Sequence, residues 1–168
     1  MDVFTIFLIF ILACILIIFK NKIEKQTKKP SKTILVDHEK LDYLATENER
    51  KLYFSLQKAL TDKYIIHSQV ALFALVKPLD YRHNSKSWAK RMDFVITDTA
   101  TKVLAVIELD DSTHNQKKRI ERDNYVNYAF KGHHPLIRIN TEKFYDPEKI
   151  AALLEIEAGI KNQFTIKG

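Results

Sequence analysis

The sequence predicts an α/β domain built around one sheet, with a transmembrane helix before it. Three observations support this fold class. The chain begins with a long uncharged run, its later part alternates between helix-like and strand-like patterns, and two neighbouring apolar strands carry acids. The order expected for the later part is α-β-β-β-α-β followed by a C-terminal helix. Such an order is typical of helices packed against a single sheet.

The N-terminal run, Val3–Phe19, contains 17 residues and no charge. A helix of this length rises about 26 Å, which is the short end of a membrane span. A cleaved signal peptide is the alternative, but it requires an early basic region and a small-residue cleavage site. This sequence has neither, so we expect residues 3–19 to form one uncleaved transmembrane helix.

Residues 20–40 are expected to form a basic linker. Six lysines and one glutamate lie between positions 20 and 32, so this segment supplies +5 of the formal net charge of +6. The positive-inside rule places this side of the membrane in the cytoplasm. We therefore expect a single-pass protein of the inner (cytoplasmic) membrane, with its soluble domain in the cytoplasm. The single cysteine, Cys14, excludes a disulfide within one chain and suits a reducing compartment.

The domain itself is expected over residues 41–158, with a tail at 159–168. Thr46 and Glu49 have the spacing of a capping box that opens a helix. Later signals are a glycine at position 132, which fits a helix C-terminus, and Asp146-Pro147, which fits a helix start. The expected elements after the first helix are a strand at about 64–72, an irregular loop at 78–90, strands at 92–97 and 103–109, a helix at 117–131, a strand at 135–140 and a last helix ending near 158.

The strands at 92–97 and 103–109 carry Asp93, Glu108 and Asp110 where a sheet interior is usually apolar. If Asp98 pairs with Val103 across a four-residue loop, Asp93 faces Glu108 with Cβ atoms about 5 Å apart. The strand period of two then puts Asp110 on the same face. A slip of one residue would move Glu108 to the opposite face.

Two close carboxylates repel each other, so one is protonated or a cation lies between them. One interpretation is a structural ion-pair cluster with Arg91 or Arg138. The other is a metal site in which Asp93 and Glu108 hold Mg²⁺ or Mn²⁺, the hard cations that oxygen ligands favour. Mg²⁺ usually takes one or two carboxylates together with substrate phosphates, which indicates phosphodiester chemistry.

Several short motifs occur in a fixed order on these elements. The order resembles that of the PD-(D/E)xK nuclease superfamily, whose core is restriction-endonuclease-like. The closer resemblance is to its small variants related to very-short-patch repair endonucleases, among them an uncharacterised bacterial family that often follows an N-terminal membrane helix. The resemblance covers about residues 41–140 and rests on Thr46–Glu49, Gln69, Asp93-Phe94, Glu108–Asp111, His114, Arg122-Asp123 and Arg138.

The resemblance implies a membrane-anchored, metal-dependent hydrolase acting on DNA. Asp93 and Glu108 would bind the ion, and Asp110 would bind a metal water or orient His114. Asp110 stands where the superfamily has a lysine, so His114 is expected to supply the general base instead. Glu49 would reach the site from the first helix.

Basic residues on the helix after the acids would contact phosphates; they are Lys118, Arg119 and Arg122. These residues fit equally a solvated helix face, and Glu49 fits equally a cap on the Thr46 backbone. Two other functions therefore remain open. One is a nuclease-fold module that binds DNA or protein without catalysis, and the other is a membrane scaffold whose domain binds a protein.

Overall fold

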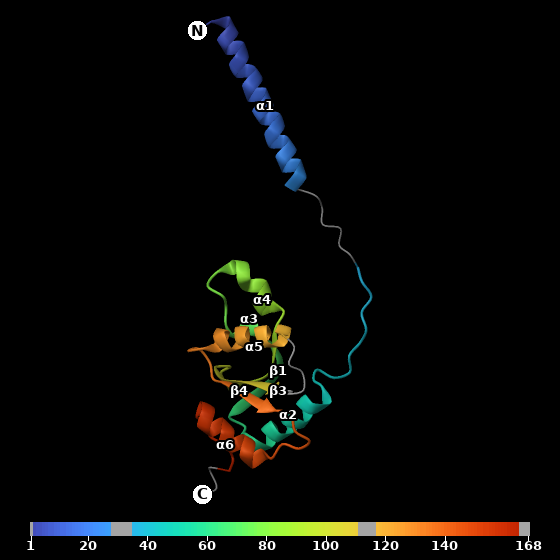
Figure 1. Cartoon of the computed structure of the whole chain (residues 1–168), viewed down its shortest axis with the longest axis vertical. Helices are drawn as coiled ribbons and strands as arrows, with labels where there is room; N and C mark the ends of the chain where they lie inside the picture. Colours follow the sequence, from blue (N-terminus) through green and yellow to red (C-terminus); the bar gives the residue numbers. More distant parts are fainter. Residues whose placement is uncertain (1, 28–34, 111–116, 165–168) are drawn as a thin grey trace. The chain divides into compact units, whose positions relative to one another are not determined.

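The computed structural model describes residues 2–27, 35–110 and 117–164, and the chain divides into two compact units (Figure 1). The first unit is Met1–Lys40 and contains one helix, α1 (Val3–Thr27). The second unit is Leu41–Gly168 and contains the sheet. The boundary between the two units coincides with the position where the sequence predicts the domain to begin.

Helix α1 carries large apolar side chains that are exposed. Phe10 is 65% exposed and Leu16 is 63% exposed. The helix continues past Phe19 to Thr27, through the first residues that we expected to form a linker. In the part of the chain that the structure describes, no helix meets the combined length and hydropathy that a membrane span requires.

The second unit has the element order that the sequence predicts, with short helices added between the first two strands. The sheet order is β1-β2-β3-β4, antiparallel except for the parallel pair β3 and β4. The elements are α2 (Glu47–Ala59), β1 (Tyr64–Ala71), α3 (Leu72–Leu75), η1 (Tyr81–His83), α4 (Asn84–Trp88), β2 (Arg91–Asp98), β3 (Val103–Asp110), α5 (Lys117–Phe130), β4 (Leu136–Asn140) and α6 (Pro147–Ala158).

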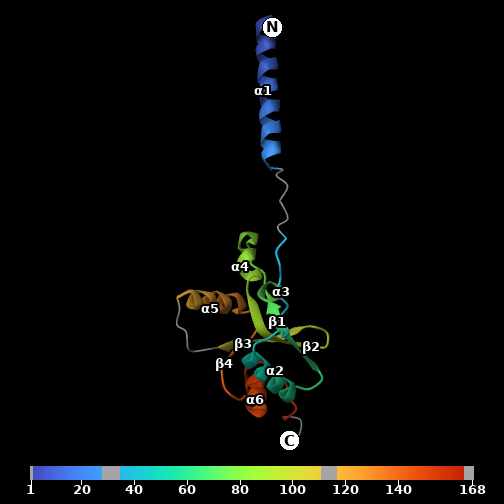
Figure 2. The ribbon, with the colours of Figure 1, turned by 90° about the vertical axis from the view of Figure 1, so that its right-hand side faces the viewer.

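Helices cover both faces of this sheet, as Figures 1 and 2 show. Helices α2 and α6 lie on one face, where Leu56 and Leu154 pack with Phe94 of β2. Helix α5 lies on the other face, where Val126 packs with Val106 of β3. The central strands are therefore buried on both sides, which explains why β2 and β3 are apolar at nearly every position.

The helix ends follow from local sequence signals. The capping box of α2 is present, because Thr46 Oγ1 accepts from the Glu49 amide and the Thr46 amide donates to the Glu49 carboxylate. Asp146 caps α6, and Gly159 ends it in the left-handed region at φ 64°. Ile160 is 2% exposed after this helix. Packing thus continues past Ala158 into residues that we expected to form a tail.

The register of the β2–β3 hairpin agrees with the prediction at the end that carries the acids. Phe94 lies opposite Ile107 and Val95 opposite Val106. The same pairing continued by one residue sets Asp93 opposite Glu108.

At the turn the prediction is wrong, because Thr97 rather than Asp98 pairs with Val103 and the register shifts there. The Asp98 carboxylate accepts the amides of Ala100 and Lys102, each at 2.9 Å. These hydrogen bonds satisfy two backbone amides of the loop and stabilise the register shift. The loop sequence contains no glycine that would have indicated this irregularity.

The segment expected to be an irregular loop instead contains η1 and α4. The Asp80 carboxylate accepts the Arg82 amide and so caps η1. Trp88, at the end of α4, packs edge-to-face on Phe73 with ring centroids 5.3 Å apart. Each helix is too short to give a periodic pattern in the sequence.

We expect the second unit to fold without α1. Its apolar clusters draw only on residues from Leu52 onward, so removal of the N-terminal helix takes away no core contact. A fragment that starts at Thr33 should therefore show a single cooperative transition by circular dichroism on heating. A soluble fragment that melts gradually, without a transition, would contradict this expectation.

Candidate functional site

The three acids of the hairpin lie on the face of the sheet that α5 covers. Strand alternation puts Asp93 on the side of Val95, and Glu108 and Asp110 on the side of Val106. Val95 and Val106 both pack in the cluster under α5. The structure therefore brings Asp93, Glu108 and Asp110 to one face at one end of the hairpin, as the sequence predicts.

Glu108 is the most constrained of these acids. It is 7% exposed, and its Oε1 atom accepts no hydrogen bond from any described residue. Burial, together with the smaller effect of the nearby charge of Asp93, raises the pKa of Glu108 to about 7. Arg122 and Arg138 oppose this shift only in part. A buried carboxylate oxygen without a hydrogen-bond partner is energetically costly, and this cost adds to the rise in the pKa of Glu108.

Asp93 lies beside it on β2. Its Oδ2 atom accepts the amide of Leu109 at 2.7 Å, which ties the carboxylate across the hairpin. Burial raises the pKa of Asp93, while this hydrogen bond lowers it and the charge of Glu49 raises it again. Asp93 and Glu108 thus form a carboxylate pair in which the charge of Asp93 disfavours ionisation of Glu108.

Asp110 belongs to an ion-pair cluster around Arg138. The parallel register of β3 and β4 sets Arg138 opposite Glu108. Arg138 Nη1 is 3.6 Å from Asp110 Oδ2, and Arg138 Nη2 is 3.8 Å from Asp123 Oδ1. Asn127 of α5 accepts from the same guanidinium at 3.0 Å. The ion-pair interpretation is therefore correct for Asp110, and this cluster adjoins the carboxylate pair.

Glu49 reaches the site while it caps α2. Its Oε2 atom accepts the Thr46 amide at 2.8 Å and the Gln69 side-chain amide at 3.2 Å. Both interpretations of Glu49 therefore hold together, because the capping carboxylate also influences the pKa of Asp93.

Gln69 has an unusual backbone conformation next to the acids. Its neighbours Ser68 and Val70 pair with Phe94 and Met92 of β2, so Gln69 occupies the position opposite Asp93. Its φ is 56°, in the left-handed region. A residue other than glycine costs about 1–3 kcal/mol there, and such conformations concentrate at functional sites.

Glu49, Gln69 and Asp93 border an open pocket of about 560 Å³. Residues from both layers reach it, α2 through Glu49 and α5 through Arg122, so the pocket lies at the end of the strands. It combines acidic and basic side chains and has no apolar floor. Its lining consists of Glu49, Gln69, Ala89, Lys90, Arg91, Asp93 and Arg122.

The structure describes only some of the basic and histidine residues that the sequence predicts for the site. Arg122 is exposed and lines the pocket. Lys118 and Arg119 lie in the first turn of α5, and their side chains are outside the described part of the chain. His114 lies outside the described residues altogether.

Sequence reasoning did not assign a role to Gln69 or Lys90 of the pocket, and it named Arg91 only as a possible ion-pair partner. Gln69 was recognised only as part of a motif. Lys90 precedes β2 and Arg91 is its first residue, so their closeness in sequence to Asp93 was the available signal.

The carboxylate pair fits a hard divalent cation. Asp93 and Glu108 offer oxygen ligands only, and Glu108 Oε1 has no competing partner among the described residues. Within residues 2–27, 35–110 and 117–164, no group of three or more His, Cys, Asp or Glu side chains could hold a metal. Two carboxylates are nevertheless the usual protein share of a Mg²⁺ site that also takes water and phosphate.

The raised pKa of Glu108 predicts how stability depends on pH without metal. A carboxyl whose folded pKa exceeds its unfolded pKa binds more protons when folded. The contribution of Glu108 to the free energy of unfolding is therefore greatest below about pH 4.5 and falls as pH rises toward about 7. At about 1.4 kcal/mol per pKa unit the effect is on the order of 3 kcal/mol. In metal-free buffer, Glu108→Gln should flatten the change in melting temperature between pH 5 and pH 8. An unchanged pH profile would show that Glu108 titrates normally.

The fold and the pocket define a mixed α/β protein that carries a carboxylate pair, the buried Glu108 and the half-buried Asp93, at one end of a four-stranded sheet. The chain belongs to the family described as protein of unknown function (DUF2726), whose model matches residues 41–157. No curated protein and no solved structure matches the chain.

Proposed function

We propose that this protein is a metal-dependent phosphodiesterase that hydrolyses DNA at the membrane. The observation that carries the proposal is the buried Glu108 Oε1, which has no partner among the described residues and lies beside a second carboxylate. A structural role would pair this oxygen with a donor, since unsatisfied buried acceptors cost about 1–3 kcal/mol each. A cation satisfies both carboxylates at once.

Asp93 and Glu108 would hold the ion, Mg²⁺ or Mn²⁺. Bound there, the ion would neutralise charge on a scissile phosphate and make a water more acidic. The hydrogen bond from Leu109 fixes the Asp93 carboxylate at 2.7 Å, so one ligand is oriented before the ion arrives. Glu49 and the strained Gln69 border the same pocket and would orient water or substrate there.

Positive charge for the phosphates would come from the helix beside the pocket. Arg122 lies close enough to both carboxylates to lower their pKa values. Lys118 and Arg119 precede it by about one turn of α5. Lys90 and Arg91 also line the pocket. A phosphodiester in the pocket would be held by both sets of groups.

The general base in this proposal is His114, which follows Asp110 by four residues. Asp110 occupies the position that holds a lysine in the PD-(D/E)xK superfamily, to which we propose that the family belongs. Its carboxylate lies near Arg138. This contact orients Asp110 and leaves the role of the lysine to His114.

A second function has one observation in its favour. An acid, Asp110, occupies the position where the superfamily has a lysine, and Arg138 lies close to it. Arg138 also lies close to Asp123, so its charge is used to neutralise carboxylates. A domain that binds DNA or protein without cleaving it would retain this arrangement. The cleavage test below separates the two functions.

We further propose that α1 anchors the protein in the inner membrane, with the second unit in the cytoplasm. The proposal rests on the uncharged run Val3–Phe19, the exposure of its apolar side chains and the lysines that follow it. A reporter fused to the C-terminus should report a cytoplasmic position. Periplasmic reporter activity, or release of the protein from membranes by salt, would contradict the anchor.

The catalytic proposal is tested with the full-length protein and plasmid, linear and single-stranded DNA. We expect cleavage with Mg²⁺ or Mn²⁺ and none with a chelator. Cleavage by a matched preparation of Asp93→Asn would indicate a contaminating nuclease. Absence of cleavage on every substrate and with every metal would favour the binding module.

A further inference from the structure

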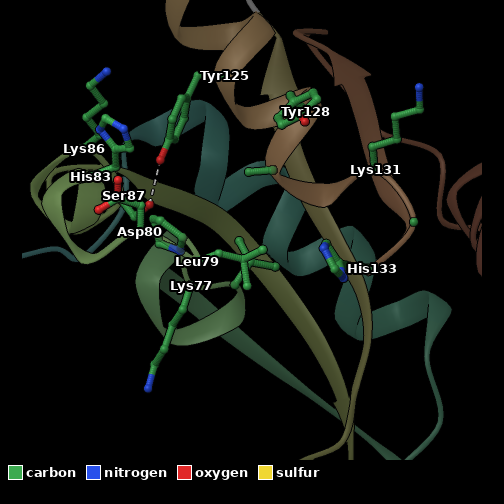
Figure 3. A pocket seen from close by; sticks show the side chains of 14 residues that line it. Lys77, Leu79, Asp80, His83, Lys86, Ser87, Tyr125, Tyr128, Lys131 and His133 are labelled. Atoms are coloured by element: carbon green, nitrogen blue, oxygen red, sulfur yellow. Dashed lines mark hydrogen bonds between the residues drawn. The ribbon is translucent and has the colours of Figure 1, made fainter.

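A second pocket lies on the α5 side of the domain, away from the carboxylate pair. Its volume is about 950 Å³, which is sufficient for a molecule of nucleotide size. Figure 3 shows it between α5 and the segment that connects β1 to β2. The lining residues that matter here are Lys77, Leu79, Lys86, Tyr125, Tyr128 and Lys131.

The interior of this pocket presents apolar and aromatic surface to solvent. Leu79 is fully exposed and Tyr128 is 80% exposed. Figure 3 shows Leu79 between Tyr125 and His133, with Tyr128 on the α5 side of the pocket. Large exposed apolar side chains gathered in one concave place indicate a ligand rather than a solvated surface.

The charge around the pocket is positive. Lys77, Lys86 and Lys131 are all exposed on its border. The one acid among the lining residues is Asp80, and the guanidinium of Arg82 neutralises it through a contact of 2.6 Å. An apolar interior with a cationic border matches a ligand that combines a flat ring with negative charge.

The second pocket is linked to the first pocket through a contact between Lys90 and Tyr125 of α5. Tyr125 borders the second pocket, and the Lys90 Nζ atom lies 4.9 Å from the centre of its ring. Lys90 itself lines the first pocket. The Tyr125 hydroxyl also lies 2.9 Å from the Ser87 hydroxyl, which fixes the ring (Figure 3). Arg122 of the first pocket precedes Tyr125 by three residues, a rise of about 4.5 Å along the helix.

We infer that the second pocket binds an unpaired base of the DNA strand whose phosphodiester lies at Asp93 and Glu108. The exposed ring of Tyr128 would stack on the base, as aromatic side chains do in proteins that bind single strands. Lys86 and Lys131 would contact the neighbouring phosphates. A base in a duplex is stacked and cannot enter the pocket, so single strands and locally unpaired sites are the substrates that fit. This inference rests on the proposed function, since it extends the same strand from one pocket to the next.

The test measures DNA binding without cleavage. Full-length protein in zwitterionic nanodiscs is titrated against a fluorescent single strand of about 12 nucleotides in the presence of a chelator. A second probe has the same length and phosphates but abasic sites in place of bases. Tyr128→Ala should weaken binding of the first probe about 5- to 150-fold, the range for loss of one stacking contact. It should not change binding of the abasic probe.

Matched variants locate the effect. Tyr128→Phe keeps the ring and should bind as the wild type does. Phe144→Ala removes an exposed aromatic side chain that lines neither pocket, and it should also leave binding unchanged. Lys131→Gln should weaken both probes equally, because it removes a phosphate contact.

Each outcome decides the inference. The inference is overturned if the wild-type protein binds both probes equally well. It is also overturned if Tyr128→Ala binds the base-containing strand as tightly as the wild type does. In either case the pocket serves another occupant, such as a protein segment. Base-dependent binding lost in Tyr128→Ala supports it even if no metal supports cleavage, in which case only the hydrolase proposal fails. Cleavage without base-dependent binding retains the hydrolase proposal and removes this one.

Discussion

Replacing Glu108 with glutamine should abolish metal-dependent DNA cleavage and, without metal, make the protein more stable at pH 8. The loss of cleavage follows because one of two ligands to the ion disappears. Charge stabilisation by a metal is worth several kcal/mol, so the rate should fall roughly 10³-fold or more. The gain in stability follows because glutamine removes a buried charge whose pKa is raised to about 7.

The opposite signs of these two effects make the experiment informative. A variant that simply misfolds loses both activity and stability, whereas a variant of a metal ligand loses only activity. Glu157→Gln is the matched control, because it removes the same charge from an exposed position on α6. If Glu108→Gln cleaves DNA at the wild-type rate, Glu108 is not a ligand of the catalytic ion.

The second large effect is expected at His114. His114→Ala should lower the rate of DNA hydrolysis about 10²–10⁴-fold, the usual loss for a positioned general base. Affinity for the metal and for DNA should stay nearly unchanged, since the carboxylate pair and the basic residues of α5 remain. Single-turnover cleavage and DNA binding, measured on the same preparation, separate the two quantities.

A rescue experiment adds a sharper test of the same role. Asp110→Lys in the His114→Ala background introduces the residue type that the PD-(D/E)xK signature has at the corresponding position. We expect partial recovery of cleavage if His114 replaces that lysine. Equal cleavage by wild type and His114→Ala would remove His114 from the mechanism.

The sequence predicts the site where local rules determine it. Alternation of buried side chains fixes the register of Phe94 against Ile107, and this register brings Asp93 and Glu108 together. The capping box spacing likewise predicts the position of Glu49. These features depend on neighbours in sequence or on one strand pair, so a sequence pattern is sufficient to predict them.

Other parts of the site depend on tertiary packing and could not be predicted. The contact of Arg138 with Asn127 joins β4 to α5 only after both pack on the sheet. The left-handed conformation of Gln69 is rare for this residue type, so no propensity indicates it. The short helices before β2 are held by contacts such as Trp88 with Phe73. The second pocket therefore had no signature in the sequence.

The most direct test of the central claim is a calorimetric titration of the full-length protein with Mn²⁺ at pH 8 and at pH 6. In the proposed site Asp93 and Glu108 share one ion, and burial raises the pKa of Glu108 to about 7, so we expect one bound ion per chain at pH 8 and weaker binding at pH 6. Asp93→Asn should show no binding at either pH. A wild-type protein that binds no ion at pH 8, or an Asp93→Asn variant that binds as well as the wild type, would contradict the metal site.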